Sequence, residues 1–526
     1  MATAPQGEKK VVIVGAGKMS AIAPPMPSKL TSRHALSTDI GIFGVSTALW
    51  MYKRGGYCVT ILDKAQILPA PDAASTDINK IIRSGDYADP TIAALNVDAV
   101  NEWRKPEWEG TYHESGVVMT AECGSAGNAY VESSYKNVCD NGIPAMHCQT
   151  SAEIRKAWPA KFRGEDVIST LSNAVSTVTH LASPTTTPRL GEFHNRTAYL
   201  NPHSGWAEAG RAVAVGLRRI ANEFGGVIRA GCEVVGLVEE QGEDGKNVVK
   251  GVRLVSGQQI LGDIVIVATG AWTPALFAQD GMEQLPQVLA TGQSVAKVQL
   301  TPEEAKLYSG NPVIFDMKTG FYVFPPTPEN IVKCAIHDKG VTYQAEQPNP
   351  NCKNDEASAK TGVSVPRTIL TPGGEAGCIP LEMLKRLRHH LSEVYPELGK
   401  RDFIATRLCW YLDTPDGDWL IDWHPKKQNL LFATAGCGHA FKFLPNIGRE
   451  IVNKIEGTLA PALDNKWRFE GRNHARDAST DSDLRGNEGH ARVAIKFEDL
   501  ATSHDLKADR FAAPQKIGTH SRESKL

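Results

Sequence analysis

An apolar run that ends in two glycines is the feature of this sequence that most restricts its fold. Val11–Val14 reads VVIV and leads into Gly15-Ala16-Gly17, a pattern typical of a buried parallel strand that enters a tight turn. In nucleotide-binding βαβ units, such a turn continues into a helix whose N-terminal N–H groups and partial positive charge bind a pyrophosphate. Small residues are needed there because the backbone approaches the ligand closely.

The expected helix does not follow the turn directly. Residues 18–41 are rich in Pro and Ser and show no clean periodicity, whereas residues 42–51 have the pattern of the missing helix. We therefore interpret 18–41 as an aberrant insertion: a retained, in-frame intron or a similar gene-model artefact, with a real surface loop as the alternative. Sequencing of the mature transcript distinguishes the two.

Without this insertion the turn is complete. Joining Gly17 to Ile42 gives GAGIFG, in which Gly15, Gly17 and Gly44 are the three glycines of GxGxxG. A second strand is predicted at residues 57–63, and Asp63 at its end is suited to accept hydrogen bonds from ribose hydroxyls. The order of strand, turn, helix, strand and acid predicts a dinucleotide site but does not choose between NAD and FAD.

Composition excludes several classes of protein. The 526 residues carry 57 Lys and Arg against 59 Asp and Glu, so no global field attracts nucleic acid or an anionic membrane. The ten cysteines form no CxxC pair and have no His partners at metal-ligand spacing, which argues against a metal site and a disulfide scaffold. There is no run of 18 apolar residues to span a membrane. The C-terminal Ser524-Lys525-Leu526 matches the peroxisomal import signal, so we expect a peroxisomal protein that binds the import receptor.

Further strand patterns predict a second domain. Residues 227–229 and 232–238 look like paired strands, and the buried strand at 263–272 is expected to return to the nucleotide sheet. Alternating strands between about 280 and 400, with a helix from Leu381, predict a separate mixed sheet. We expect residues 345–365 to form an exposed loop and 470–523 a surface tail.

Three later segments indicate the cofactor: AASTDINKIIRS at 73–84, RLCWYLDTPDGDWLID at 407–422 and AGCGHAFKFLPNIG at 435–448. Together they resemble the covalent-flavin amine oxidases, a family that includes monomeric sarcosine oxidase, pipecolate oxidase, saccharopine oxidase and the fructosyl amino acid oxidases (amadoriases). The resemblance covers about residues 9–470. It implies FAD and an α/β fold in which a Rossmann-like FAD-binding domain is interleaved with a mixed-sheet substrate domain, as in glutathione-reductase-like flavoproteins.

The resemblance also implies which residues contact the cofactor. Cys409 matches the cysteine that forms a thioether to the 8α-methyl carbon of the flavin, whereas a cysteine beside a tryptophan is otherwise more often a buried structural thiol. Lys80 matches the basic residue over the flavin. Further cofactor contacts are expected at Lys64, Ser75, Val235, Gly438, Phe441 and Lys442.

Four residues match positions that act on substrate or oxygen. Arg83 and Lys442 match the pair that meets the substrate carboxylate, a task suited to a planar bidentate donor and a second cation. Lys333 and His337 share one face of a strand because they are four residues apart. The family lysine at the position of Lys333 assists the reaction with O2, and the histidine faces the substrate. With Lys80, these two are the expected catalytic residues.

Two positions depart from the amadoriase pattern. The glutamate that contacts the sugar in amadoriases is replaced by His337, and their aspartate in the glycine stretch is absent from Ala435-Gly436-Cys437. We therefore predict an FAD-dependent oxidase that converts a secondary-amine amino acid of the saccharopine, pipecolate or sarcosine type to an imine and reduces O2 to H2O2. A fructosyl amino acid oxidase, a biosynthetic flavin amine dehydrogenase, and an inactive flavin-free protein if 18–41 is retained are the alternatives.

The predicted domains alternate along the chain. The FAD-binding domain is expected at 9–115, including the insertion, and at 201–280 and 401–470, and the substrate domain at 116–200 and 281–400. Residues 471–526 form the tail with the import signal. We expect a monomer whose small-molecule partners are the amino acid and O2.

Overall fold

The computed structural model describes residues 8–15, 41–163, 189–242, 245–277, 288–348, 360–371, 378–470 and 493–508. Gly17, residues 18–40 of the insertion and the C-terminal tripeptide therefore lie outside the described residues. None of the helices in the described ranges is long and apolar enough to cross a membrane. The mixed α/β architecture confirms the predicted fold class.

A six-stranded sheet forms around the predicted nucleotide strand. Its order is β22 (Leu420–Trp423), β24 (Leu430–Thr434), β13 (Ile264–Val267), β1 (Lys9–Val14), β2 (Tyr57–Leu62) and β9 (Val227–Arg229). All neighbours are parallel except β22 and β24. The central strand β1 is buried on both faces, which explains its continuous apolar run. The predicted return of the strand near 264 to this sheet is confirmed.

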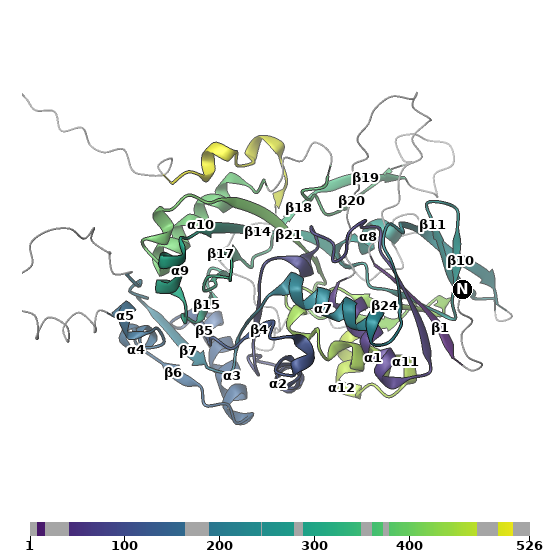
Figure 1. Cartoon of the computed structure of the whole chain (residues 1–526), viewed down its shortest axis with the longest axis horizontal. Helices are drawn as coiled ribbons and strands as arrows, with labels where there is room; N and C mark the ends of the chain where they lie inside the picture. The colour runs from purple at the N-terminus through teal and green to yellow at the C-terminus, as the bar shows by residue number, and fades with distance from the viewer. Residues whose placement is uncertain are drawn as a thin grey trace, which may run out of the picture.

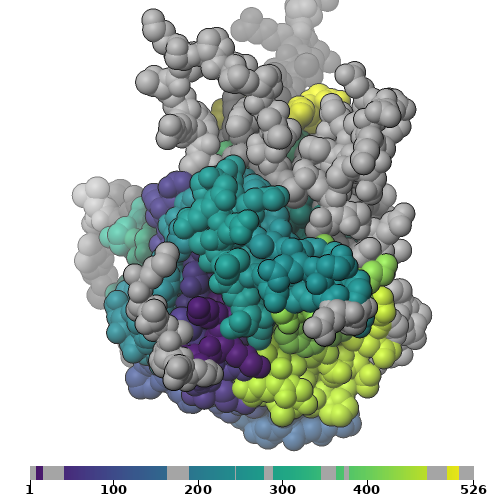
Figure 2. All heavy atoms as spheres, turned by 90° about the vertical axis from the view of Figure 1, so that its right-hand side faces the viewer, coloured from purple at the N-terminus to yellow at the C-terminus, as the bar shows by residue number. Residues whose placement is uncertain are grey.

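Helices α1 (Ile42–Arg54), α7 (Ala209–Asn222) and α11 (Ile447–Glu456) lie together beside this sheet (Figure 1). Glycines allow their close packing. A Cβ on Gly448 of α11 would lie 2.0 Å from the Ser46 carbonyl oxygen of α1, and one on Gly216 of α7 would lie 2.5 Å from a Val45 methyl carbon. Figure 2 shows the purple N-terminal segment beside the yellow-green C-terminal one, as the 2.5 Å ion pair between Arg54 and Glu456 requires.

A ten-stranded mixed sheet forms the second layer. Its strands, in sheet order, are β25 (Val493–Ala494), β18 (Val341–Thr342), β14 (Leu289–Gln299), β17 (Ile331–Ile336), β16 (Phe321–Val323), β15 (Val313–Asp316), β5 (Val117–Glu122), β7 (Arg196–Asn201) and β6 (Met146–Cys148), with β21 (Ala405–Asp413) paired to β14. Helix α10 (Leu381–Val394) packs on this sheet through Leu384, Leu387 and Leu391, which are fully buried. The antiparallel pairing of β21 with β14 sets Cys409 opposite Gln293.

Smaller sheets complete the sheet topology. The first consists of β10 (Val234–Gln241), β11 (Asn247–Leu254), β12 (Gln259–Leu261) and β23 (Lys427–Gln428), the second of β3 (Lys80–Ile82), β8 (Gly205–Ala207) and β4 (Tyr112–His113), and the third of β19 (Gln344–Pro348) and β20 (Lys360–Ser364). The remaining α-helices are α2 (Pro90–Trp103), α3 (Ala126–Asp140), α4 (Ser151–Arg155), α5 (Ala160–Arg163), α8 (Thr273–Phe277), α9 (Pro302–Tyr308) and α12 (Pro461–Trp467).

Three local expectations were wrong. Strands β9 and β10 do not pair with each other, because β9 extends the nucleotide sheet and β10 turns into a separate antiparallel sheet with β11. The expected loop at 345–365 contains the strand pair β19 and β20. Part of the expected tail, residues 493–508, is anchored on the large sheet through β25 and a Leu506 carbonyl that accepts hydrogen bonds from Phe403 and Arg388.

Candidate active site

Two adjoining hollows lie between the nucleotide sheet and the large sheet. The helix-side hollow, of about 640 Å³, is lined by Gly41, Ile42, Phe43, Ala74, Ser75, Lys80, Ala268, Gly270, Ala271, Trp410, Tyr411, Leu412, Gly436, Cys437, Gly438, Ala440 and Phe441. The sheet-side hollow, of about 660 Å³, is lined by Lys80, Ile81, Arg83, Tyr130, Phe315, Met317, Tyr322, His337, Tyr411, Gly438, His439, Phe441 and Lys442. Four residues line both, so the hollows form one continuous site: Lys80, Tyr411, Gly438 and Phe441.

The start of helix α1 opens into the helix-side hollow. Gly41 and Ile42 line the hollow, and no side chain of a described residue caps the first turn of α1, so its N-terminal N–H groups are suited to bind an anion. The Gly15 N–H donates to the Leu62 carbonyl at 2.8 Å, which holds the end of β1 beside the end of β2. Gly44 is buried within the first turn of α1.

The residues expected around the nucleotide ribose lie at the same end of β2, directly after Leu62. Asp63 is fully buried, and its Oδ1 accepts a hydrogen bond from the Ala65 N–H at 2.7 Å. Its carbonyl accepts the Cys232 N–H at 2.7 Å, which brings the start of β10 and Val235 close to this position. Lys64 lines neither hollow, since its ammonium lies 3.7 Å from the centre of the Trp272 ring.

The Cys409 thiol contacts Lys80 and the Ala74 carbonyl, two residues that line the helix-side hollow, although Cys409 itself lines neither hollow. Cys409 is buried in β21, and the Lys80 Nζ donates to its Sγ at 3.3 Å. Lys80 comes from β3, which pairs with β8, and its side chain contributes to both hollows. Nearby, Ser75 is also buried, and its Oγ has no hydrogen-bond partner among the described residues. A buried cysteine, a cation and an unsatisfied hydroxyl therefore surround one wall of the hollow.

Lys333 is brought near this wall but lines neither hollow. It is completely buried, and its Nζ lies 2.6 Å from Asp77 Oδ2 and donates to the Asn79 carbonyl at 2.6 Å. Burial lowers the pKa of Lys333 to about 8, against the opposing attraction of Asp77. The sequence indicated Lys333 but gave no signal for its partner, because Asp77 and Lys333 are far apart in the chain.

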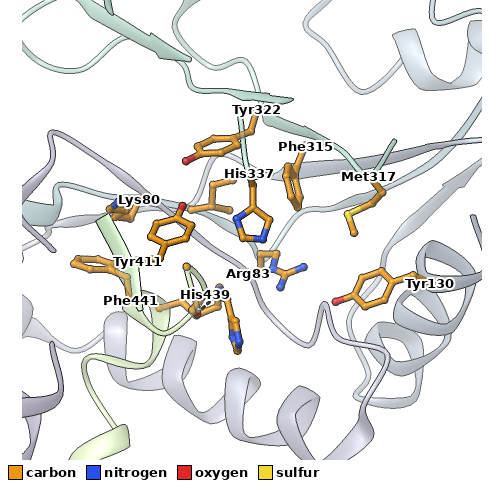
Figure 3. Close-up of a pocket in the computed structure, with 13 residues that line it drawn as sticks. Lys80, Arg83, Tyr130, Phe315, Met317, Tyr322, His337, Tyr411, His439 and Phe441 are labelled. Carbon is orange, nitrogen blue, oxygen red and sulfur yellow. Dashed lines mark hydrogen bonds between the residues drawn. The ribbon is translucent and has the colours of Figure 1, made fainter. Parts of the chain in front are cut away.

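Arg83 projects from the strand that carries Lys80 into the sheet-side hollow (Figure 3). The guanidinium lies 4.4 Å from the centre of the Tyr87 ring, is nearly buried, and makes no hydrogen bond to any described residue. Asp86 attracts this guanidinium electrostatically, but its carboxyl group accepts its hydrogen bonds from Tyr199, Asn201 and Ser204. A buried guanidinium without a hydrogen-bond partner is chemically suited to bind a carboxylate.

Lys442 lies at the same end of the hollow as Arg83. Its Nζ donates to the Tyr87 hydroxyl at 2.9 Å and to the His439 carbonyl at 2.6 Å. The His439 ring lies 3.3 Å from the Tyr87 hydroxyl through Nδ1 and 3.0 Å from the Gly417 carbonyl through Nε2. Tyr87 thus contacts both predicted carboxylate-binding cations. Our sequence analysis missed it, although it follows Arg83 closely in the chain.

Aromatic side chains enclose the sheet-side hollow around His337. The imidazole lies between the rings of Phe315 and Tyr411, with centroid separations of 6.1 and 5.7 Å. Tyr322 stands beside Tyr411, and its burial raises the pKa of the phenol. These rings were not identified from the sequence, because single aromatic residues in strands are usually part of the core.

A strained loop borders both hollows. Ala435 and Cys437 have φ values of +57° and +48°, and Gly438 follows with +77°. Such values are costly for residues other than glycine and occur mainly where the surroundings impose them, often at functional sites. A Cβ on Gly438 would lie 2.3 Å from a Tyr411 ring carbon, so the loop packs directly on the ring that lines both hollows.

Comparison with known proteins gives related sequences and folds. Residues 40–454 match the family described as FAD dependent oxidoreductase (DAO). L-saccharopine oxidase of Schizosaccharomyces pombe is 30% identical over 83% of this chain and 93% of its own, and the amino acid oxidase imqH of Aspergillus flavus is 27% identical over 82% and 96%. The fructosamine oxidase Amadoriase II of Aspergillus fumigatus has a similar fold, with a TM-score of 0.69, 24% identity, and coverage of 95% of this chain and 98% of its own.

Proposed function

This chain belongs to the FAD dependent oxidoreductase family, and we propose that it oxidises a secondary-amine amino acid with covalent FAD attached to Cys409. Its similarity to named amino acid oxidases establishes the enzyme class, an amine-oxidising flavoenzyme with O2 as acceptor. The observation that supports the substrate class is the unbonded Arg83 guanidinium, which shares a hollow with Lys442.

The helix-side hollow has features that fit FAD. The start of α1 offers N–H groups to the pyrophosphate, and the Ser75 hydroxyl has no hydrogen-bond partner in the described part of the chain. The glycine-containing loop at 435–438 brings backbone close to the space where a flat ring system would lie. Gly15, Gly44, Asp63, Lys64, Val235, Phe441 and Lys442 remain proposed cofactor contacts, as does Gly17, which lies outside the described residues.

The protein residues prepare the substrate for oxidation. Arg83 and Lys442 bind the carboxylate, and Phe315, Tyr322 and Tyr411 exclude water around the amine. His337, directly after the end of β17, would face the substrate, while Lys80 lies at the junction of the two hollows. Bound FAD would supply the redox chemistry: it would take up the two electrons and two protons that the amine loses as it becomes an imine, and would pass them to O2 to give H2O2.

The cations also set the protonation state of the amine. Only the neutral amine is oxidised, and nearby Arg83, Lys442 and Lys80 disfavour a protonated amine electrostatically. We therefore expect kcat to rise with pH through an ionisation of the bound substrate. Steady-state turnover between about pH 6 and 10 tests this. A constant kcat across that range would refute it.

Arg83→Gln tests the carboxylate site. Loss of a charge-assisted hydrogen bond costs roughly 1.5–3 kcal/mol, so kcat/KM for N-alkyl amino acids falls by about 10- to 100-fold. The same amines with an amide in place of the carboxylate should lose much less. Arg196→Gln is the control, because it breaks a 2.8 Å ion pair with Asp316 in the large sheet. It should leave kcat/KM for the acid relative to the amide unchanged. Equal losses for acid and amide substrates would contradict the assignment.

Covalent attachment is tested by acid precipitation. Flavin that is bound by the wild-type protein should stay in the pellet, whereas Cys409→Ser should release it as free FAD into the supernatant. Cys334→Ser is a matched control, since Cys334 is also buried in the large sheet, whereas it is the Cys409 thiol that contacts Lys80 at the wall of the helix-side hollow. Release of colour from the wild-type pellet would refute the thioether.

Peroxisomal location is proposed from the C-terminal tripeptide. Peroxide release makes such a compartment suitable, and the signal is read by a receptor. A fluorescent protein fused ahead of the chain should accumulate in peroxisomes, and removal of Leu526 should leave it in the cytosol. The same distribution with and without Leu526 would exclude the signal.

A further inference from the structure

Asp77 is the centre of a buried cluster of cations. Its carboxylate is completely buried and lies 2.6 Å from the Lys333 Nζ, and Lys297 and Arg407 approach it at 3.8 Å each. Lys80 contributes a fourth positive charge. Burial alone would raise the pKa of Asp77, but these cations outweigh it and hold the pKa below its usual range. Asp77 is therefore a carboxylate at neutral pH.

The cluster is joined to the site through the backbone of one short segment. Asp77 and Asn79 hold the Lys333 ammonium, and the next residue, Lys80, lines both hollows and contacts Cys409. The Asp77 Oδ1 also accepts the Ile78 N–H at 2.9 Å, which keeps the segment in its turn. The side-chain amide of Asn79 is fully buried without a hydrogen-bond partner among the described residues, so polar capacity remains beside Lys333.

We propose that Asp77 is a positioning residue that keeps the Lys333 ammonium protonated and in place, and thereby sets the pH range in which the enzyme reacts with O2. This inference rests on the proposed function and on the role that the family resemblance implies for Lys333, namely assistance of the reaction with O2. Among the described residues, the charged and titratable groups around Lys333 are Asp77, Lys80 and Cys409, together with Lys297 opposite it on β14 and Arg407 on the far side of Asp77; the Phe324 ring centre is 5.0 Å away. Of these, only Asp77 carries a full negative charge, so it is the main group that opposes loss of the proton.

The sign of the pH effect follows from this balance. The pKa of Lys333 is lowered to about 8 with Asp77 present, because burial is only partly compensated. Replacing Asp77 with Asn removes the attraction and lowers the pKa of Lys333 further. As the pH rises, Lys333 therefore loses its proton at a lower pH in the variant than in the wild type.

The experiment compares the holoenzyme with Asp77→Asn, Lys333→Met and Asp338→Asn. The rate of flavin reoxidation by O2 should fall above about pH 8 in the wild type. In Asp77→Asn this decline should begin at a pH about one unit or more lower. Anaerobic reduction by substrate should be much less affected. The flavin absorbance of the resting enzyme should titrate in parallel, and this transition should be absent from Lys333→Met. Asp338 forms a buried 2.8 Å ion pair with Arg386 outside the site, so Asp338→Asn should not shift either profile.

The proposal would be overturned if, in Asp77→Asn, neither the decline of the reoxidation rate nor the absorbance transition moves to a lower pH. A decline of the reoxidation rate that is also unchanged in Lys333→Met would overturn it as well. If Asp77→Asn is too unstable for kinetics, the double variant Asp77→Asn/Lys333→Met removes the uncompensated charge of Lys333. Its melting temperature should then be closer to that of the wild type than the melting temperature of Asp77→Asn is. Simple additivity of the two losses would refute the coupling. A colourless protein from which residues 18–41 have been removed, or a flavin-containing one that produces no peroxide, would instead refute the proposed function.

Discussion

The unsatisfied Ser75 hydroxyl distinguishes a cofactor contact from a structural serine. Because its Oγ is buried without a partner, replacing it with a methyl group removes a desolvation cost of roughly 1–3 kcal/mol from the cofactor-free protein. Ser75→Ala should therefore raise or preserve the melting temperature without FAD. In a Cys409→Ser background, where FAD binds reversibly, the same change should weaken FAD binding by about tenfold. Fluorescence titration with FAD measures the second effect.

Ser294 provides the control for this comparison. Its Oγ is equally buried and unpartnered, but it lies on β14 and lines neither the helix-side nor the sheet-side hollow. Ser294→Ala should therefore affect thermal stability without any change in FAD affinity. Equal FAD affinities for the Ser75 and Ser294 variants would show that Ser75 does not contact the cofactor.

Gly438 leaves no room for a side chain beside the Tyr411 ring. An added Cβ would lie 2.3 Å from a Tyr411 ring carbon, and the residue already has a φ of +77°. Gly438→Ala must therefore displace Tyr411, a ring that lines both hollows. We expect loss of bound flavin in the purified protein, read as the ratio of absorbance at 450 to that at 280 nm. Gly457→Ala, at a helix end with open space around it, has a similar backbone strain but should keep the wild-type ratio.

At the scale of elements, the contact between α1 and α11 supports the cofactor turn. The Gly448 N–H donates to the Ser46 Oγ at 2.8 Å, and a Cβ there would lie 2.0 Å from the Ser46 carbonyl oxygen. Gly448→Ala forces the helices apart at a cost of roughly 3 kcal/mol. Since α1 carries the N–H groups that face the hollow, both the melting temperature and flavin retention should fall.

A glycine in α7 provides the matched control. A Cβ on Gly210 would lie 3.4 Å from the Thr76 carbonyl oxygen, an ordinary contact. Gly210→Ala should be tolerated or slightly stabilising, because alanine is favoured over glycine in helices by about 1 kcal/mol. If both substitutions lower stability equally, helix packing at Gly448 is not the cause.

Sequence patterns predicted elements better than the pairing between them. The nucleotide strand and helix α1 were predicted because apolar periodicity and glycines are local signals. The association of β9 with β2 was missed because short strands carry no signal that identifies their neighbour. At the site, the family resemblance predicted that Arg83 and Lys442 act together on the substrate carboxylate, although they are far apart in the sequence. Asp77 was not recognised, since a buried carboxylate is defined by cations distant in the chain.

At the scale of the whole molecule, residues 18–41 determine whether the cofactor site can be complete. The family match begins at residue 40, after most of this segment, although β1 already occupies the centre of the nucleotide sheet. A chain lacking 18–41 joins Gly17 to Ile42 and restores GxGxxG at the start of α1. It should purify as a yellow protein, whereas the full chain should bind markedly less flavin because the pyrophosphate turn is interrupted. Flavin per chain, measured after proteolysis for the covalent form, checks this. Equal flavin content in both chains would show that the segment is a tolerated loop.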